Sequence, residues 1–133
     1  MQAKKVNSIK KGQRTERSIF KILSDKLDLK LVRRLDAARS GGCDSLDVPG
    51  WSIEIKSGAF WRNSFWDQAE LQSMGSGVRP VLFFKPDRKG IEVYMHLHDL
   101  SPLFPPAPRP PVKIDVDSWC ELVKLQNKVK KTK

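Results

Sequence analysis

Residues 42–56 read Gly42-Cys43-Asp44-Ser45-Leu46-Asp47-Val48-Pro49-Gly50-Trp51-Ser52-Ile53-Glu54-Ile55-Lys56, which is typical of a short β-hairpin with Pro49-Gly50 as its turn. Because side chains alternate along a strand, Ile53 and Ile55 share one face of the second arm, and Glu54 and Lys56 share the other. The hairpin therefore predicts a carboxylate and an ammonium group side by side, near a further acid on the first arm.

The segments around this hairpin predict further helices and strands. Apolar residues recur at helical spacing after Thr15, which can cap a helix that ends near Leu27. Further helices are expected at 64–74 and 116–129, and further strands at 29–35, 80–84 and 91–97. Because segment 80–84 is almost wholly apolar, we expect it in the centre of a covered sheet. The order of elements predicts an α/β domain with a mixed β-sheet flanked by helices.

The chain ends differ in composition from this core, which we expect to span residues 15–100. Residues 1–14 are rich in lysine and poor in apolar side chains, which predicts a basic flexible arm. Proline is concentrated between Pro102 and Pro111, so segment 101–115 is expected to be an extended connector. Residues 116–133 are expected to form a C-terminal helix with a basic tail.

The composition bounds the class of protein. The chain has 133 residues, of which 39% are hydrophobic, enough for one modest core. It shows no apolar run of membrane-spanning length and no signal-peptide pattern, so we expect a cytoplasmic protein. Cys43 and Cys120 match no metal-ligand spacing and are expected to be reduced thiols.

The net charge is +10, from 25 Lys and Arg against 15 Asp and Glu. A surplus of this kind favours a polyanionic partner, because each phosphate contact releases condensed counterions. We therefore expect the protein to bind DNA and not a membrane.

The hairpin residues suit metal-dependent phosphodiester hydrolysis. That reaction needs a cation that polarises the phosphate, an activated water and relief of the charge that develops in the transition state. Mg²⁺ prefers hard oxygen ligands and keeps several waters, so Asp44, Glu54 and the Ile55 carbonyl would suffice as protein ligands. Lys56 could orient the water, assist its deprotonation or stabilise charge on phosphorus.

The Gly-Gly-Cys-Asp sequence, the Val-Pro-Gly spacer and the Trp-Ser-Ile-Glu-Ile-Lys sequence together resemble the PD-(D/E)XK nuclease superfamily. The likeness is to small phage-type endonucleases and archaeal-type Holliday-junction resolvases. It implies a restriction-endonuclease-like fold, Mg²⁺ with Mn²⁺ as a substitute, and DNA cleavage with Asp44, Glu54 and Lys56 as catalytic residues.

The resemblance extends over roughly residues 11–97 and implies further site residues. Glu16, early in the first helix, and Gln68, on the helix after the hairpin, match catalytic positions. The Lys-Gly opening, the Arg-rich strand and the Ser-Gly loop match other features of these proteins. The expected DNA-binding residues, from these matches and from basic positions nearby, are Lys11, Arg14, Arg33, Arg34, Arg39 and Ser40.

The first acid of the site has two candidates, Asp44 and Asp47. A strict two-residue turn pairs Asp47 with Ser52, which puts Asp47 on the Glu54 face and Asp44 opposite Ile55. A bulge or a longer loop reverses that parity. The resemblance favours Asp44.

The resulting functional hypothesis is a small Mg²⁺-dependent DNA endonuclease, structure-selective for branched DNA. The resemblance to resolvases implies a homodimer, because symmetric cutting of two strands requires two sites. The alternative is a non-catalytic nucleic-acid-binding or phage assembly protein that retains the nuclease fold.

Overall fold

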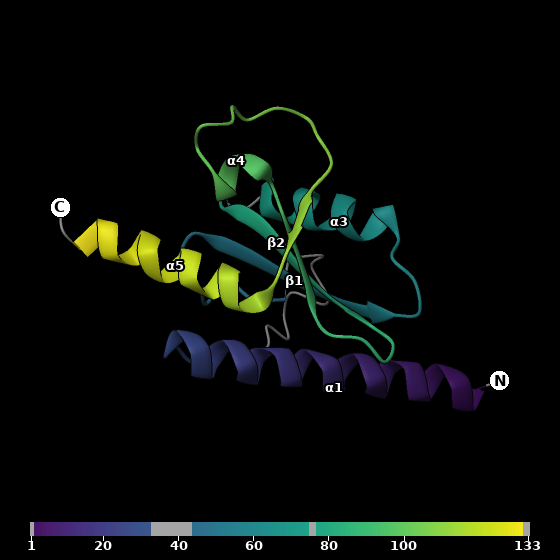
Figure 1. The fold of residues 1–133 in the computed structure, drawn as a ribbon. Coiled ribbons are helices and arrows are strands. Elements are labelled where there is room, and N and C mark those ends of the chain that lie inside the picture. The colour runs from purple at the N-terminus through teal and green to yellow at the C-terminus, as the bar shows by residue number, and fades with distance from the viewer. Residues whose placement is uncertain (1, 33–43, 75–76, 132–133) are drawn as a thin grey trace.

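The computed structural model describes residues 2–32, 44–74 and 77–131 of the chain (Figure 1). The elements in chain order are α1 (Gln2–Leu27), β1 (Trp51–Gly58), α3 (Asn63–Met74), β2 (Arg79–Pro86), β3 (Glu92–Met95), α4 (Leu97–Leu100), β4 (Val112–Ile114) and α5 (Val116–Lys131).

These strands form one four-stranded mixed sheet in the order β1-β2-β3-β4. β1 and β2 are parallel, because α3 carries the chain back between them, and the other two pairs are antiparallel. α1 and α5 cover one face of the sheet and α3 covers the other (Figure 1). The predicted mixed sheet flanked by helices is confirmed, with the apolar strand β2 in its interior.

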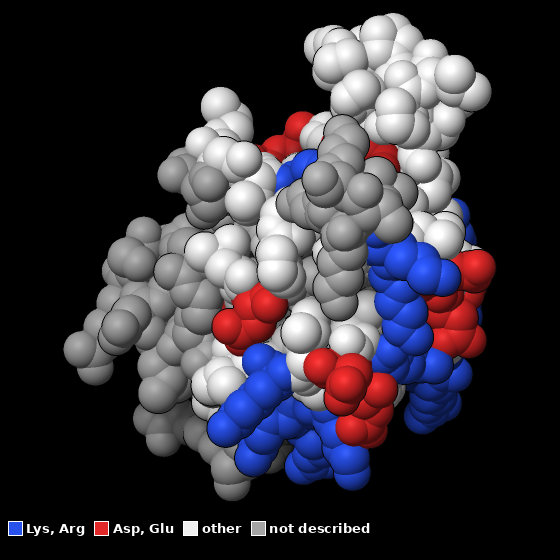
Figure 2. All heavy atoms as spheres, turned by 90° about the vertical axis from the view of Figure 1, so that its left-hand side faces the viewer, with Lys and Arg blue, Asp and Glu red and all other residues white. Residues whose placement is uncertain are grey.

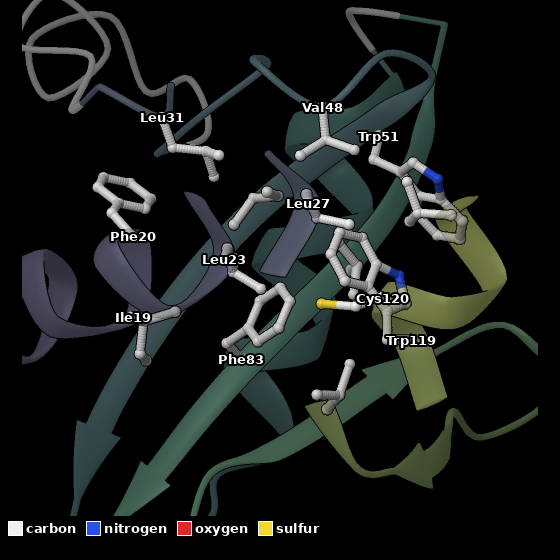
Figure 3. Close-up of a cluster of buried hydrophobic side chains, with 14 of the residues drawn as sticks. Ile19, Phe20, Leu23, Leu27, Leu31, Val48, Trp51, Phe83, Trp119 and Cys120 are labelled. Carbon is white, nitrogen blue, oxygen red and sulfur yellow. The ribbon is translucent and has the colours of Figure 1, made fainter. Parts of the chain in front are cut away.

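The main hydrophobic core lies between the sheet and the helices α1 and α5. Ile53 and Ile55 of β1 face this core, as the alternation along the strand predicts. The fully buried Trp119 of α5 lies edge-on to Trp51 and Phe83, with ring centroids 5.4 Å and 5.1 Å away (Figure 3). The C-terminal helix is therefore part of the same core as α1.

A smaller cluster fills the opposite face of the sheet, under α3. Trp66 of α3 packs there against Leu82 and Phe84 of β2. Because Glu54 and Lys56 alternate with the core-facing isoleucines, they lie on this second face. No helix among the described residues is both long and apolar enough to cross a membrane.

The first helix is longer than predicted. It begins at Gln2 rather than at Thr15, so residues 2–14, expected as a flexible basic arm, are helical. Lysine, glutamine and alanine are good helix formers, and Gly12 opposes the helix by only about 1 kcal/mol. An ion pair between Lys11 and Asp87, in the turn after β2, also ties this part of the helix to the sheet.

The predicted strand at 29–35 is not observed over 29–32, and 33–35 lie outside the described residues. The backbone donors of this segment are bonded elsewhere. The N–H of Leu29 donates to the Ser24 carbonyl at 3.2 Å, and the N–H of Leu31 donates to Ser24 Oγ at 3.1 Å. These bonds hold the segment against the end of α1 and leave it unpaired with the sheet.

The connector predicted for 101–115 ends in a short strand that the sequence prediction missed. Val112 and Ile114 of β4 pair with Met95 and Val93 of β3. Three residues are too few for periodicity to distinguish a strand from a loop, so only the pairing partner reveals it. The strand predicted at 91–97 correspondingly ends at Met95, and α4 follows.

Candidate active site

Glu54 and Lys56 lie side by side near the end of β1, on the face that α3 covers. Lys56 Nζ is 3.5 Å from Glu54 Oε1, and the side chains are 25% and 6% exposed. Lys56 Nζ also lies 5.9 Å from the centroid of the Phe65 ring, at the start of α3. The ammonium group is therefore held between a carboxylate and an aromatic ring, at a position that solvent still reaches.

The hairpin places Asp44, and not Asp47, opposite Glu54. Pro49 and Gly50 form the predicted turn, in which the N–H of Trp51 donates to the Val48 carbonyl at 3.1 Å. Gly50 has φ +86°, which the second central position of this turn requires and glycine adopts without strain.

The first arm carries one extra residue beyond this turn, so that Ser45 and not Leu46 pairs with Ile53. The N–H groups of Asp44 and Ser45 both donate to the Ile53 carbonyl, at 2.9 Å and 3.2 Å, which is the pattern of a β-bulge. The extra residue between the turn and Ser45 reverses the side-chain parity of a strict two-residue hairpin, and the bulge lies one step further, at Asp44 and Ser45.

The two aspartates consequently have different partners. Asp44 Oδ2 accepts the Ile55 N–H at 2.7 Å, which fixes its carboxyl group along the open edge of β1. Asp47 Oδ2 accepts the Val32 N–H at 2.7 Å and the Ser45 hydroxyl at 3.2 Å. Asp47 therefore holds the segment after α1, whereas Asp44 belongs to the Glu54 cluster.

Glu16 reaches the same cluster from α1, on the other side of the sheet. It is 9% exposed and hydrogen-bonds to the Asp44 carboxyl group. Ile53 and Ile55 point their backbone polar groups away from β2, toward the first arm, as their bonds to that arm show. The Ile55 carbonyl therefore faces the Asp44 side, where it was predicted to act as a ligand.

Burial and the closeness of the two carboxyl groups determine the electrostatics of the cluster. Burial, and secondly the negative charge of Asp44, raise the pKa of Glu54 from 4.5 to about 8, although Lys56 opposes this. Burial also raises the pKa of Asp44, against the hydrogen bonds from the Ile55 N–H and Glu16. Ionising both carboxyl groups costs free energy because their charges repel, and a cation bound between them would reduce this repulsion.

These residues fit a divalent ion with few protein ligands. Glu54 Oε2 is buried and accepts no hydrogen bond from the described residues. This oxygen could therefore bind a cation without losing a hydrogen bond. No group of three or more Asp, Glu, His or Cys side chains within those residues is arranged to hold an ion. The two carboxylates of Asp44 and Glu54 with the Ile55 carbonyl could hold Mg²⁺, because that ion retains several waters and needs few protein ligands.

The other predicted site residues that the structure describes, Gln68, Lys11 and Arg14, lie outside the cluster. Gln68 is exposed on α3, and no hydrogen bond or ion pair among the described residues joins it to Glu54 or Lys56. Lys11 pairs with Asp87, and Arg14 is exposed on α1. Four predicted DNA-binding residues lie outside the described residues: Arg33, Arg34, Arg39 and Ser40.

Residues next to the cluster were missed by the sequence prediction. Ser57, Lys85 and Arg88 lie at the end of β1 and around the turn after β2. The sequence contains part of the information needed to place these residues together, because the carboxyl ends of parallel strands meet at one edge of a sheet. Recognising it required knowing that β1 and β2 are neighbours.

A scan against protein-family models and a search of curated proteins found no match for this chain. The solved structures similar to it include Hjc from Archaeoglobus fulgidus, a Holliday junction resolvase from an archaeal hyperthermophile. That protein is 18% identical, and the match covers 82% of this chain and 87% of the other, with a TM-score of 0.47. Holliday-junction resolvases are among the proteins that the sequence resembles.

Proposed function

We propose that this protein is a Mg²⁺-dependent DNA endonuclease that hydrolyses phosphodiester bonds. The observation that carries the proposal is the half-buried Asp44 beside the buried Glu54, whose pKa the charge of Asp44 helps to raise, with Lys56 Nζ 3.5 Å from Glu54 Oε1. A purely structural role would not favour a buried acid whose pKa is raised to about 8, because its ionisation opposes folding at neutral pH.

The proposed mechanism assigns each residue a task. A bound divalent ion would polarise the phosphate and lower the pKa of a water ligand. Asp44 and Glu54, as carboxylates, would hold the ion, and the Ile55 N–H keeps Asp44 in place at 2.7 Å. Glu16 positions Asp44 through their hydrogen bond. Lys56 donates hydrogen bonds to the attacking water or to the charged phosphate oxygens, which an ammonium group does without a change of protonation state.

The net charge of +10 supports a polyanionic substrate. Among the described residues, the positive charge is unevenly distributed over the surface. Figure 2 shows a side on which Lys and Arg lie among Asp and Glu. An ion pair between Lys26 and Asp117 joins the end of α1 to the start of α5. We propose DNA as the partner, with the contacting cations on another side of the molecule.

The finer features of the hypothesis are part of the same proposal. We propose selectivity for branched DNA, because the sequence resembles the Holliday-junction resolvases, and a homodimer, because symmetric cutting requires two sites. Mn²⁺ is expected to replace Mg²⁺, and the site of action would be the cytoplasm of a bacterial or phage-infected cell. Size-exclusion chromatography with light scattering tests the dimer directly.

The experiment that tests the activity incubates the purified protein with branched, duplex and single-stranded DNA, in Mg²⁺, in Mn²⁺ and with a chelator. We expect product only with the divalent ions, and none from Glu54→Gln. Glu121→Gln makes the same chemical change at an exposed position of α5 and should cleave like the wild type. A folded wild-type protein that binds DNA but forms no product under any condition would instead support the non-catalytic alternative.

A further inference from the structure

A second polar feature lies beside the carboxylate cluster, on the α1 side of the sheet. It is a surface hollow of about 360 Å³ at the carboxyl ends of β1 and β2, lined by Lys11, Thr15, Ser57, Lys85, Asp87 and Arg88 among others. At about 30 Å³ for each water molecule, the hollow has room for a phosphate group together with several waters. We call it the basic hollow.

The chemistry of the basic hollow suits an anion. Three cations, Lys11, Lys85 and Arg88, line it against one carboxylate, Asp87, which pairs with Lys11. Lys85 Nζ donates to the Pro86 carbonyl at 2.9 Å, which leaves two of its three N–H groups for another acceptor. Cationic side chains together with hydroxyl groups are the usual donors to the phosphates of a nucleic-acid backbone.

Chain connectivity ties the hollow to the candidate active site. Thr15 directly precedes Glu16 on α1, and Ser57 directly follows Lys56 on β1. Adjacent residues of a strand are roughly 3.3 Å apart, and each strand of duplex DNA carries one phosphate per roughly 3.4 Å of helix axis. Because neighbouring side chains of a strand point to opposite faces, Ser57 faces α1 whereas Lys56 faces α3, so the hollow borders the cluster at Glu16 and not at Lys56.

We infer that the basic hollow binds a backbone phosphate of the same DNA strand, next to the phosphate at Asp44, Glu54 and Lys56. This inference rests on the proposed nuclease function and adds to it a positioning site. A phosphate held in the hollow fixes the direction and register of the strand, so that one particular bond lies at the carboxylates.

The test uses short DNA duplexes in which a single phosphate is replaced by a neutral methylphosphonate, one position at a time. Binding is measured without Mg²⁺, so that it does not depend on cleavage. We expect one position at which the neutral group weakens binding to the wild type several-fold and has no such effect on Arg88→Gln or Lys85→Gln. The slope of log K against log salt concentration should also become shallower by about 0.9 for each phosphate that the protein no longer neutralises.

Lys89→Gln is the matched control, because Lys89 lies in the same turn, is exposed and does not line the hollow. It should keep the sensitivity of the wild type to the neutral phosphate. Absence of DNA binding, absence of a sensitive position, or equal behaviour of Arg88→Gln and Lys89→Gln would each overturn the inference. Cleavage is measured separately. If the protein cuts DNA but the effect of the neutral phosphate does not depend on Arg88 or Lys85, the phosphate site in the hollow is refuted and the nuclease function is not. If that dependence is seen without cleavage, the nuclease function is refuted and the phosphate site is not.

Discussion

Replacing Glu54 by glutamine removes the buried carboxyl group whose pKa burial and the charge of Asp44 raise to about 8. Glutamine keeps the shape of a protonated glutamate but cannot ionise. The difference between the variant and the wild type therefore measures how much the ionisation of Glu54 lowers the free energy of unfolding.

The sign follows from the protons bound in each state. Between its unfolded pKa of 4.5 and its folded pKa of about 8, Glu54 is protonated when folded and ionised when unfolded. Since the unfolded state then binds fewer protons, the free energy of unfolding falls as the pH rises through this window. At 1.36 kcal/mol for each pKa unit, the loss between pH 5 and pH 9 is on the order of 3–4 kcal/mol. The raised pKa of Asp44 adds to the loss in the same direction.

The assay is urea unfolding of the wild type and of Glu54→Gln at pH 5, 7 and 9, with a chelator present to remove divalent ions. We expect the variant to be close to the wild type at pH 5 and more stable than it at pH 9, by about the 3–4 kcal/mol worked out above. In the Glu121→Gln control, the difference from the wild type should be equal at the three pH values.

A difference between Glu54→Gln and the wild type that does not change with pH would refute the reasoning. It would mean that Glu54 ionises in the folded protein as easily as in water, so that neither burial nor Asp44 opposes its charge. Addition of Mg²⁺ to the wild type at pH 9 should recover part of the loss, because the ion takes the place of the proton.

Further predictions concern the other residues of the site and the core. Lys56→Met should lower single-turnover cleavage by roughly 10²–10⁴-fold with little change in DNA affinity; equal losses in both would contradict its placement at the reacting phosphate. Asp44→Asn should abolish cleavage. Asp47→Asn should cleave normally but lose about 1–2 kcal/mol of stability in urea unfolding. The reverse pattern would exclude Asp44 as a catalytic residue. Trp119→Ala should cost about 3–5 kcal/mol in the same measurement, whereas Leu125→Ala, 54% exposed on the same helix, should cost less than about 1 kcal/mol. Similar small costs for both would mean that α5 is not part of the core.

Much of the architecture was predictable because it depends on local periodicity. The apolar run in β2 predicted an interior strand, and helical spacing predicted α3, α5 and the apolar face of α1. The errors fell where periodicity is weak. The three residues of β4 are too short to show a pattern, and the basic residues before Thr15 form a helix without a clear apolar stripe.

The candidate site divides in the same way. The sequence by itself determined that Glu54 and Lys56 share one face, because alternation along a strand is a local property. Only the tertiary structure decided that Asp44 and not Asp47 joins them, because one extra residue between the turn and Ser45 shifts the register of the first arm and reverses its parity. It also brought Glu16 from α1 to the cluster and set Lys85 and Arg88 beside Ser57, since long-range packing and the parallel pairing of β1 with β2 fix those contacts. The raised pKa of Glu54 belongs to this second group, because burial and the approach of Asp44 arise only when the chain is folded.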